Sequence, residues 1–340
     1  MAKNDIKNKN TGYKPDKPYK DFTKKEKIIA WTTFYRRNPA RFIEHYLGLN
    51  LYFFQKIMIT LMFRFPFVVL LCSRAVSKSY TTSVFAVAYC ILYPNSKVLT
   101  TSFTKLQANL LITEKVVKEL MPRSPNLCRE IKGVKTNKES TELMFKNNSS
   151  FITSVSGESA RGLRSTILVV DEFRLVKEDV KNEILVPTMI QRPAEYLQFE
   201  EYRDLVEEPT QIYLSSAFWK SHWMWDTIRY AMKGAYKNEA VLFCTDYFTT
   251  IKYGIKTRKQ MIQAKANAGE LGWLMEYCNI MMGGSDNQYY SYDLINEAQC
   301  IPKAWYPRTT EEYFETTDER RGKRVKTGTW FGDIPKKEDE

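Results

Sequence analysis

The hydrophobic pattern of this chain consists of short apolar runs that end abruptly in polar residues. One run starts at Phe67, and the others lie within residues 97–102, 166–172, 211–217 and 240–247. Unbroken runs of Val, Ile and Leu are typical of strands that are buried on both faces of a parallel sheet. Helical spacing of apolar residues appears between several of them, as in residues 103–121. The pattern therefore predicts an α/β fold with a mainly parallel sheet.

Further elements complete this prediction. Residues 27–46 are spaced as two short helices, and another helix ends near Arg64. Residues 142–155 contain two apolar stretches around an Asn-Asn-Ser turn, a pattern that favours a pair of adjacent strands. A long helix is expected over residues 258–277.

The run that starts at Phe67 leads into the most informative loop of the chain. Small or polar residues follow it, then Lys78 and Ser79, and then an apolar segment that Pro94 stops. Strand, tight loop, Lys-Ser and helix form the layout of a phosphate-binding loop, in which backbone N–H groups and a helix N-terminus converge on an anion. In such a loop the lysine reaches the β- and γ-phosphates and the serine hydroxyl binds Mg²⁺.

The loop departs from the usual pattern G-x-x-x-x-G-K-[ST] at both glycines. Cys72 and Ser77 occupy those positions. Glycine at the second position lets the backbone approach the phosphates without a Cβ atom in the way. Taken alone, the stretch fits either a nucleotide site or an ordinary strand-to-helix turn.

A second strand supplies acidic residues that suit a nucleotide site. The run 166–170 ends in Asp171 and Glu172. Two carboxylates directly after a buried strand are expected at the carboxyl edge of the sheet, where ligands bind in open α/β folds. In a phosphate-loop enzyme the first acid holds the Mg²⁺ shell and the second orients the attacking water. The alternative is a strand that simply runs into a surface loop.

Two weaker candidates lie before and after these strands. Gln55 stands among aromatic residues at a helix start, where its amide could pair with an adenine edge while Tyr52 or Phe53 packs on the ring. The alternative for Gln55 is an exposed position on an amphipathic helix. Ser215 and Ser216 end another strand, where hydroxyls could sense the γ-phosphate; a plain strand end is the alternative.

Composition adds limits to this picture. The chain has 340 residues, a formal charge of +12 and six scattered cysteines without a C-x-x-C pair. Such a charge favours polyanionic partners, although a lysine-rich surface kept for solubility is the alternative. The cysteine spacing indicates neither a zinc site nor a disulfide framework. No run is long enough to span a membrane, and the N-terminus has no secretory pattern.

In chain order the motifs are Gln55, the loop 73–79, the basic segment 160–164, the strand 167–172 and the small residues 215–217. In this order they resemble the ATPase half of the large terminase subunit of tailed bacteriophages, from about Lys27 to Cys300. The arginine inside the phosphate loop is characteristic of that family. Members hydrolyse ATP to pump double-stranded DNA into an empty capsid.

The resemblance implies an α/β P-loop NTPase fold of the additional-strand (ASCE) type, with a small lid subdomain. It implies ATP and Mg²⁺ as cofactors. Nucleotide binding would involve the adenine motif and the phosphate loop, namely Gln55, Ser73, Arg74, Ala75, Val76, Ser77, Lys78, Ser79 and Tyr80. The other implied roles are Ser79 and Asp171 for the metal, Glu172, Arg74 and Arg161 for catalysis, and Ser215, Ser216 and Ala217 for coupling.

The resemblance also implies partners, a location and a division of the chain. The partners are double-stranded DNA, the portal protein, the small terminase subunit and other copies in a ring. The location is the cytoplasm of the infected bacterium, with a transient stay on the procapsid. The expected parts are a disordered basic tail (1–26), the ATPase core (27–235), a lid or linker subdomain (236–310) and a polar tail (311–340).

Three alternatives stay open at this stage. No nuclease half is recognised after Cys300, so the nuclease is expected on a separate polypeptide or the chain is a truncated or split product. A helicase-like ATPase shares the Asp-Glu strand but needs a second RecA-like domain. A DNA-binding or structural subunit that has lost hydrolysis is the third alternative, suggested by Ser77.

Overall fold

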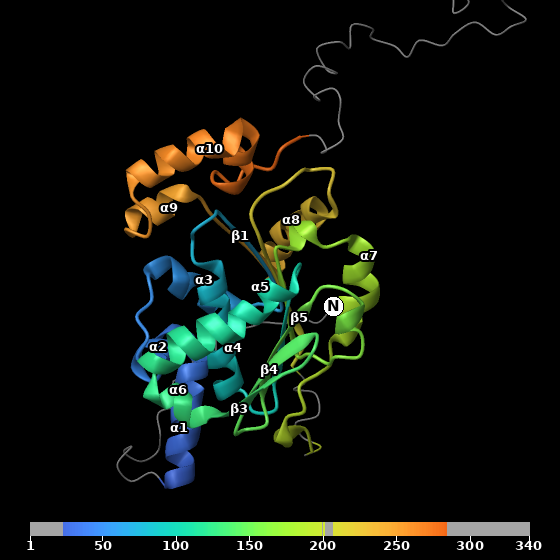
Figure 1. Ribbon diagram of the computed structural model, residues 1–340. Coiled ribbons are helices and arrows are strands. Elements are labelled where there is room, and N and C mark those ends of the chain that lie inside the picture. Colours follow the sequence, from blue (N-terminus) through green and yellow to red (C-terminus); the bar gives the residue numbers. More distant parts are fainter. Residues whose placement is uncertain (1–22, 199, 201–206, 284–340) are drawn as a thin grey trace, which may run out of the picture. The chain divides into compact units, whose positions relative to one another are not determined.

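A single mixed sheet is the centre of the computed structural model, which describes residues 23–198, 200 and 207–283 (Figure 1). Within these residues the sheet has eight strands in the order β3-β4-β5-β2-β6-β7-β1-β8. The strands are β1 (Phe67–Cys72), β2 (Lys97–Ser102), β3 (Ile131–Thr136), β4 (Ser140–Phe145), β5 (Ser150–Val155), β6 (Ile167–Asp171), β7 (Thr210–Ser215) and β8 (Ala240–Thr245). All neighbours pair in parallel except β3 with β4 and β4 with β5.

The strand order confirms the expected additional-strand arrangement. β7 lies between β1, which leads into the lysine-bearing loop, and β6, which ends in the two acids. Leu70 of β1 is level with Leu214 of β7, and Tyr213 of β7 is level with Val170 of β6. Because these strands are parallel, the polar residues that follow them emerge at one edge of the sheet.

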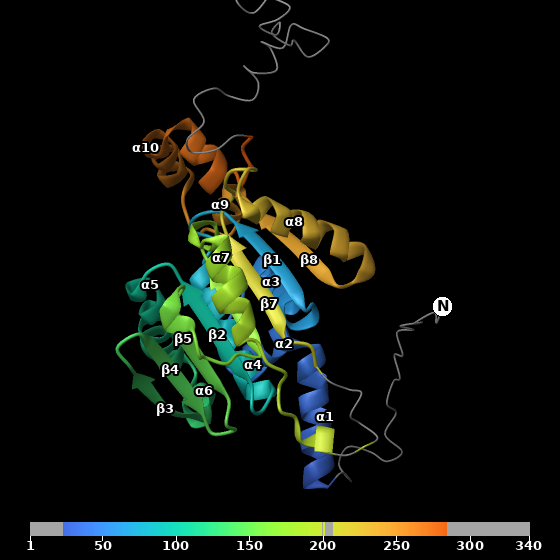
Figure 2. The same cartoon turned by 90° about the vertical axis from the view of Figure 1, so that its right-hand side faces the viewer.

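Helices cover both faces of the sheet (Figure 1, Figure 2). α3, α4, α5 and α6 lie on one face, and α7 and α8 lie on the other. The helices are α1 (Lys24–Arg37), α2 (Pro39–His45), α3 (Phe53–Arg64), α4 (Lys78–Leu92), α5 (Lys105–Leu110), α6 (Pro125–Glu130), α7 (Glu178–Val180), α8 (Trp223–Gly234), α9 (Tyr247–Lys252) and α10 (Arg258–Glu276). α9 and α10 lie beyond the edge at which β1 ends.

Each central strand contributes to two hydrophobic cores because successive side chains point to opposite faces. In β1, Val68 and Leu70 pack with α3 and α4, whereas Val69 and Leu71 pack with α8. All four side chains are at most 3% exposed. Burial on both faces explains why the sequence of β1 shows no alternation of apolar and polar residues.

The helices α6, α7, α8 and α9 were not predicted, and three further elements differ from the expected ones. β3 was not predicted; it is an exposed edge strand that pairs only with β4 and carries little apolar sequence. The helix expected over 103–121 begins as α5 and continues as π-helix over Leu111–Leu120. α10 is interrupted at Gly269, whose φ of 68° and ψ of 170° are not helical.

The expected tails fall almost entirely outside the described residues, as do residues 284–310 of the expected lid. The division of the remaining residues into core and lid stays a prediction. Among the helices of the described residues, none combines the length and apolar character needed to cross a bilayer.

Candidate active site

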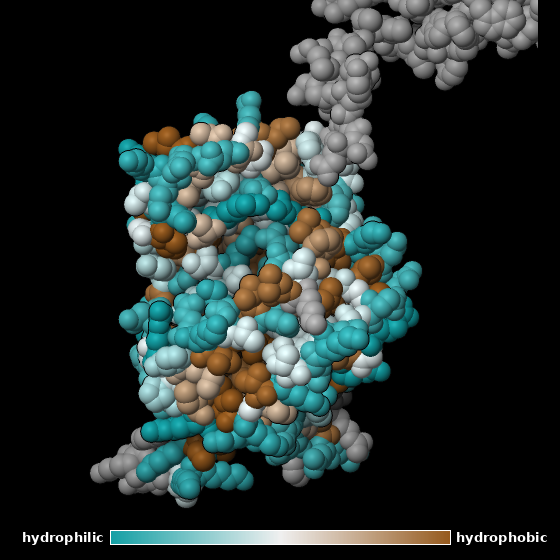
Figure 3. Space-filling view, viewed as in Figure 1, coloured by the Kyte–Doolittle hydropathy of each residue, from teal (hydrophilic) through white to brown (hydrophobic). Residues whose placement is uncertain are grey.

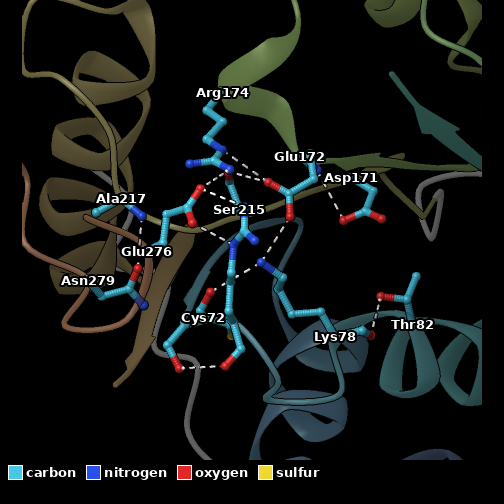
Figure 4. Close-up of polar contacts among 12 residues, drawn as sticks. Cys72, Lys78, Thr82, Asp171, Glu172, Arg174, Ser215, Ala217, Glu276 and Asn279 are labelled. Carbon is cyan, nitrogen blue, oxygen red and sulfur yellow. Dashed lines mark hydrogen bonds and ion pairs between the residues drawn. The ribbon is translucent and has the colours of Figure 1, made fainter. Parts of the chain in front are cut away.

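The residues after β1, β6 and β7 meet at the carboxyl edge of the sheet (Figure 4). Lys78 Nζ lies 3.1 Å from Glu172 Oε1, although the two residues are far apart in sequence. The hydroxyl of Ser215, at the end of β7, donates to Glu172 Oε2 over 3.2 Å. The structure thus joins the lysine of the loop, the second acid and the first of the predicted coupling residues.

The backbone of this site is unusual. Seven non-glycine residues with positive φ occur among the described residues, and four of them are Asn, a residue that tolerates the left-handed region. The other three are Ala75 (φ 67°), Ser77 (φ 57°) and Glu172 (φ 48°). All three belong to the predicted site, in keeping with the tendency of backbone strain to concentrate at functional sites.

Ser77 adopts the conformation that glycine adopts most easily. It is the N-cap of α4, with φ 57° and ψ 36°. The missing glycine of the loop is therefore replaced by a serine that accepts left-handed geometry, at a cost of about 1–2 kcal/mol for an L-residue.

Glu172 is held as a carboxylate by basic neighbours. Burial would raise its pKa, but the positive charges of Lys78 and Arg174 outweigh burial, so the pKa lies below its usual range. Lys78 also donates to the Cys72 carbonyl over 3.2 Å. In this state Glu172 and Lys78 neutralise each other.

Asp171 is in a different electrostatic situation. Burial and, next, the charge of Glu172 raise the pKa of Asp171 to about 6. Its Oδ1 accepts the Glu172 N–H over 3.0 Å. A buried carboxylate at this edge is suited to a cation, and Ser79, in the first turn of α4, offers a hydroxyl oxygen. Carboxylate and hydroxyl oxygens are ligand types that suit Mg²⁺, which commonly uses one or two protein ligands together with phosphates and water.

Arg74 is tied to the end of α10. Its Nε lies 2.6 Å from Glu276 Oε2, its Nη2 donates to Glu276 Oε1 over 2.9 Å, and its backbone N–H donates to the Glu276 carbonyl over 2.8 Å. The Arg74 side chain is 56% exposed, so its guanidinium is accessible from outside the site.

The coupling residues are tied to the segment that follows α10. The N–H of Ala217 donates to Asn279 Oδ1 over 2.8 Å, and Asn279 Nδ2 donates to the Thr245 carbonyl at the end of β8 over 2.6 Å. The same carbonyl accepts the N–H of Ser73 over 3.2 Å. Ser215, Ser216 and Ala217 are buried.

Gln55 is buried and its Oε1 accepts the N–H of Tyr52 over 2.9 Å, so the alternative of an exposed surface position is wrong. The Tyr52 ring lies 5.2 Å from the ring of Tyr253 in the connection between α9 and α10. In the loop, Val76 is fully buried, and Tyr80, in the first turn of α4, packs against the core. Adenine recognition by Gln55 stays a prediction.

Arg161 is not part of the cluster. It is exposed, and its guanidinium pairs with Glu158 of the same turn, with Nε 2.7 Å from Oε2. Among the described residues, no hydrogen bond or ion pair joins it to Lys78 or Glu172. Its predicted action on a neighbouring subunit is therefore untested by the isolated chain.

A cavity of about 360 Å³ adjoins the loop, lined by Arg74, Ala75, Lys256, Gln260, Met261, Ala264 and Tyr277. It lies between the tip of the phosphate loop and α10. Figure 3 shows a hydrophilic hollow below the α9–α10 region at the top of the view. This space directly adjoins Arg74 and Ala75 of the predicted phosphate loop.

Sequence reasoning missed three residues of this site, namely Arg174, Glu276 and Asn279. Arg174 lies directly after the predicted acids, and its position near them was the only available signal. Glu276 and Asn279 lie about 100 residues further along, where nothing in the local pattern distinguishes them from surface residues.

Comparisons with known proteins agree with this geometry. The family model described as "Terminase large subunit, ATPase domain" matches residues 53–198, which include the phosphate loop and the acidic strand. The comparison with curated proteins gave no significant match.

Two solved structures of one terminase ATPase domain share the fold. The large terminase ATPase domain of Thermus phage P74-26 is 16% identical, with a TM-score of 0.52, and the match covers 72% of this chain and 99% of that domain. A variant of the same domain gives 15% identity, a TM-score of 0.51 and coverage of 72% and 100%. The large terminase of bacteriophage HK97 is 15% identical, with a TM-score of 0.47 and coverage of 78% of this chain and 52% of that one. The resemblance seen in the motifs is thus confirmed, and residues 53–198 belong to the ATPase domain family of the terminase large subunit.

Proposed function

We propose that this chain is an ATP-hydrolysing motor subunit that moves double-stranded viral DNA into a procapsid. The proposal combines the family membership of residues 53–198 with the arrangement of charged residues at the sheet edge. The observation that carries it is the 3.1 Å contact between Lys78 Nζ and Glu172 Oε1, which brings the loop lysine and the second acid to one point.

The charges of the cluster suit an exchange of partners when ATP binds. Three basic side chains face three acidic ones in the described state: Lys78, Arg74 and Arg174 face Asp171, Glu172 and Glu276. Triphosphate oxygens are strong acceptors for lysine and arginine. Lys78 would leave Glu172 for the β- and γ-phosphates, while backbone N–H groups of residues 75–79 surround them.

Glu172 would then act on water. Once Lys78 has turned to the phosphates, Glu172 Oε1 is released to accept a hydrogen bond from the attacking water and to orient it in line with the γ-phosphate. Ser215 stays within hydrogen-bonding distance of the other oxygen, so the carboxylate keeps a fixed position. Asp171 and Ser79 would hold Mg²⁺. When bound, this ion neutralises charge that develops on the phosphate oxygens.

Ser215 and Ala217 offer a route from hydrolysis to movement. Ser215 contacts Glu172, and Ala217 contacts Asn279 after α10. A change at Glu172 would therefore reach α10 through contacts that span only a few residues. In this proposal the DNA, the portal protein, the small terminase subunit and a ring of identical chains are the partners, in the cytoplasm of the infected host.

The test is ATP hydrolysis by the purified chain, with and without linear double-stranded DNA. Glu172→Gln is expected to reduce kcat by about 1,000-fold, because the residue that orients water is lost while ATP binding is nearly unchanged. Lys78→Ala is expected to weaken ATP binding by at least about tenfold, because a charge-assisted contact to phosphate is lost. Binding is measured with a fluorescent ATP analogue.

Matched controls come from an exposed ion pair, Lys118 with Glu114. Glu114→Gln and Lys118→Ala make the same chemical changes outside the site and should leave turnover and binding unchanged. ATP binding without turnover in the unmodified chain would favour a structural subunit that has lost hydrolysis. Equal loss of binding in both site variants would remove Glu172 from the proposed role.

A further inference from the structure

Arg174 lies between two carboxylates of the site (Figure 4). It comes from the turn Phe173–Leu175 directly after β6. Its Nε is 3.3 Å from Glu172 Oε2, and its Nη2 donates to Glu276 Oε1 over 2.9 Å. The side chain is 13% exposed, so water has little access to this contact.

The Nε–H group of Arg174 makes no aligned hydrogen bond in the described structure. It is buried and has no hydrogen-bond partner among the described residues, although Glu172 Oε2 is close. The attraction between them is therefore one of charge without an aligned hydrogen bond. A small rotation of the Glu172 carboxylate toward Arg174 would complete this bond, and burying an unpaired donor is otherwise unfavourable.

Such a rotation would be opposed by Lys78 in the described state. Lys78 contacts Glu172 Oε1, whereas Arg174 faces Oε2, so the two basic groups attract the carboxylate from different sides. If ATP draws Lys78 to its phosphates, Arg174 is the remaining basic partner of Glu172 in the described structure, and the neutral Ser215 is the other contact.

We propose that Arg174 is a positioning residue that fixes the carboxylate of Glu172 for water activation once Lys78 has turned to the phosphates. The inference rests on the proposed ATPase function. Its contact with Glu276 also connects Glu172 to the end of α10 through a single side chain.

Removal of Arg174 is expected to leave the fold intact. Glu172 keeps Lys78, and Glu276 keeps Arg74, so neither carboxylate loses its only basic partner. Arg174→Gln removes the charge and keeps polarity. Arg174→Met is a second variant that keeps the length of the side chain and replaces a buried charge with an apolar group, a change that folded proteins often tolerate.

The experiment measures kcat, ATP affinity and melting temperature for both variants. We expect kcat to fall by about 100-fold, the loss typical of a misplaced catalytic group, while ATP affinity stays within about twofold. Arg174→Lys should recover part of kcat, because it returns the charge without the planar guanidinium. Arg229→Gln, at an exposed arginine of α8, is the matched control and should change nothing.

A double variant gives a second test. If Arg174 acts through Glu172, adding Arg174→Gln to Glu172→Gln should lower kcat no further than Glu172→Gln alone. Multiplicative losses in the double variant, an unchanged kcat in Arg174→Gln and Arg174→Met, or parallel losses of kcat and affinity would each overturn the inference. If the unmodified chain hydrolyses ATP and the Arg174 variants keep full kcat, only this inference is refuted. If the unmodified chain is inactive, the proposed function and this inference are both refuted.

Discussion

Glycine at positions 75 and 77 is expected to stabilise the protein. Ala75 and Ser77 have φ of 67° and 57°, in the left-handed region. An L-residue there costs about 1–2 kcal/mol, a cost that glycine does not carry. Glycine also gives the unfolded chain more freedom, which costs about 0.5–1 kcal/mol. The net gain is about 0.5–1 kcal/mol for each substitution, and about 1–2 kcal/mol for Ala75→Gly with Ser77→Gly.

The side chains that are lost contribute little to this balance. Ala75 is exposed, and Ser77 makes no side-chain hydrogen bond to the first turn of α4. The Ser77 carbonyl, which glycine retains, accepts the Thr81 N–H over 3.0 Å. The sign of the effect therefore depends on backbone conformation alone.

The assay is urea unfolding followed by tryptophan fluorescence, which gives the free energy of unfolding for each variant. Ala266→Gly is the matched control, because Ala266 is exposed in the regular part of α10 before Gly269. There the same substitution should destabilise by about 0.5–1 kcal/mol. If Ala75→Gly and Ser77→Gly destabilise the protein as Ala266→Gly does, the backbone at residues 75 and 77 does not carry the cost of a left-handed conformation, and the reasoning is refuted.

Two other predictions concern buried groups. Alkylation at pH 8 should modify the exposed Cys128 well before Cys72 and Cys90. Burial raises the pKa of both buried thiols to about 12 and so keeps them protonated and unreactive. Mass spectrometry would report the order of modification, and early labelling of Cys72 in the folded protein would contradict the prediction. Arg192→Ala should lower the free energy of unfolding by about 2 kcal/mol in the same urea assay. The reason is that Arg192 is buried and pairs through two nitrogens with the partly exposed Glu207. A change within about 0.5 kcal/mol, typical of surface sites, would count against this prediction.

The sequence was most informative where physical constraints are strictest. Strands buried on both faces must be apolar throughout, so β1 and β6 were visible as continuous runs. Parallel strands place the residues that follow them at one edge, so Lys78 and Glu172 could be predicted to meet. The identity of the second acid followed from its place directly after the run.

The remaining contacts depend on packing that the local sequence does not specify. Glu276 and Asn279 reach the site because α10 ends beside the phosphate loop, a position set by contacts between distant segments. β3 was missed because pairing with β4 alone positions it, without an apolar face. The buried state of Gln55 likewise depends on neighbouring helices, since glutamine is usually a surface residue.

Asn279 gives α10 one anchored end. Its amide joins the chain after β7 to the last carbonyl of β8, across the end of β1, and the buried Ala217 N–H would lose its acceptor if the side chain turned away. Gly269, with its non-helical backbone, interrupts the same helix about ten residues earlier. The helix therefore combines an anchored C-terminal end with a break in its helical backbone at Gly269. The end of α10 is thus tied to the central strands by the Asn279 amide and by the contacts of Glu276 with Arg74 and Arg174, and a non-helical residue separates the first half of the helix from these ties.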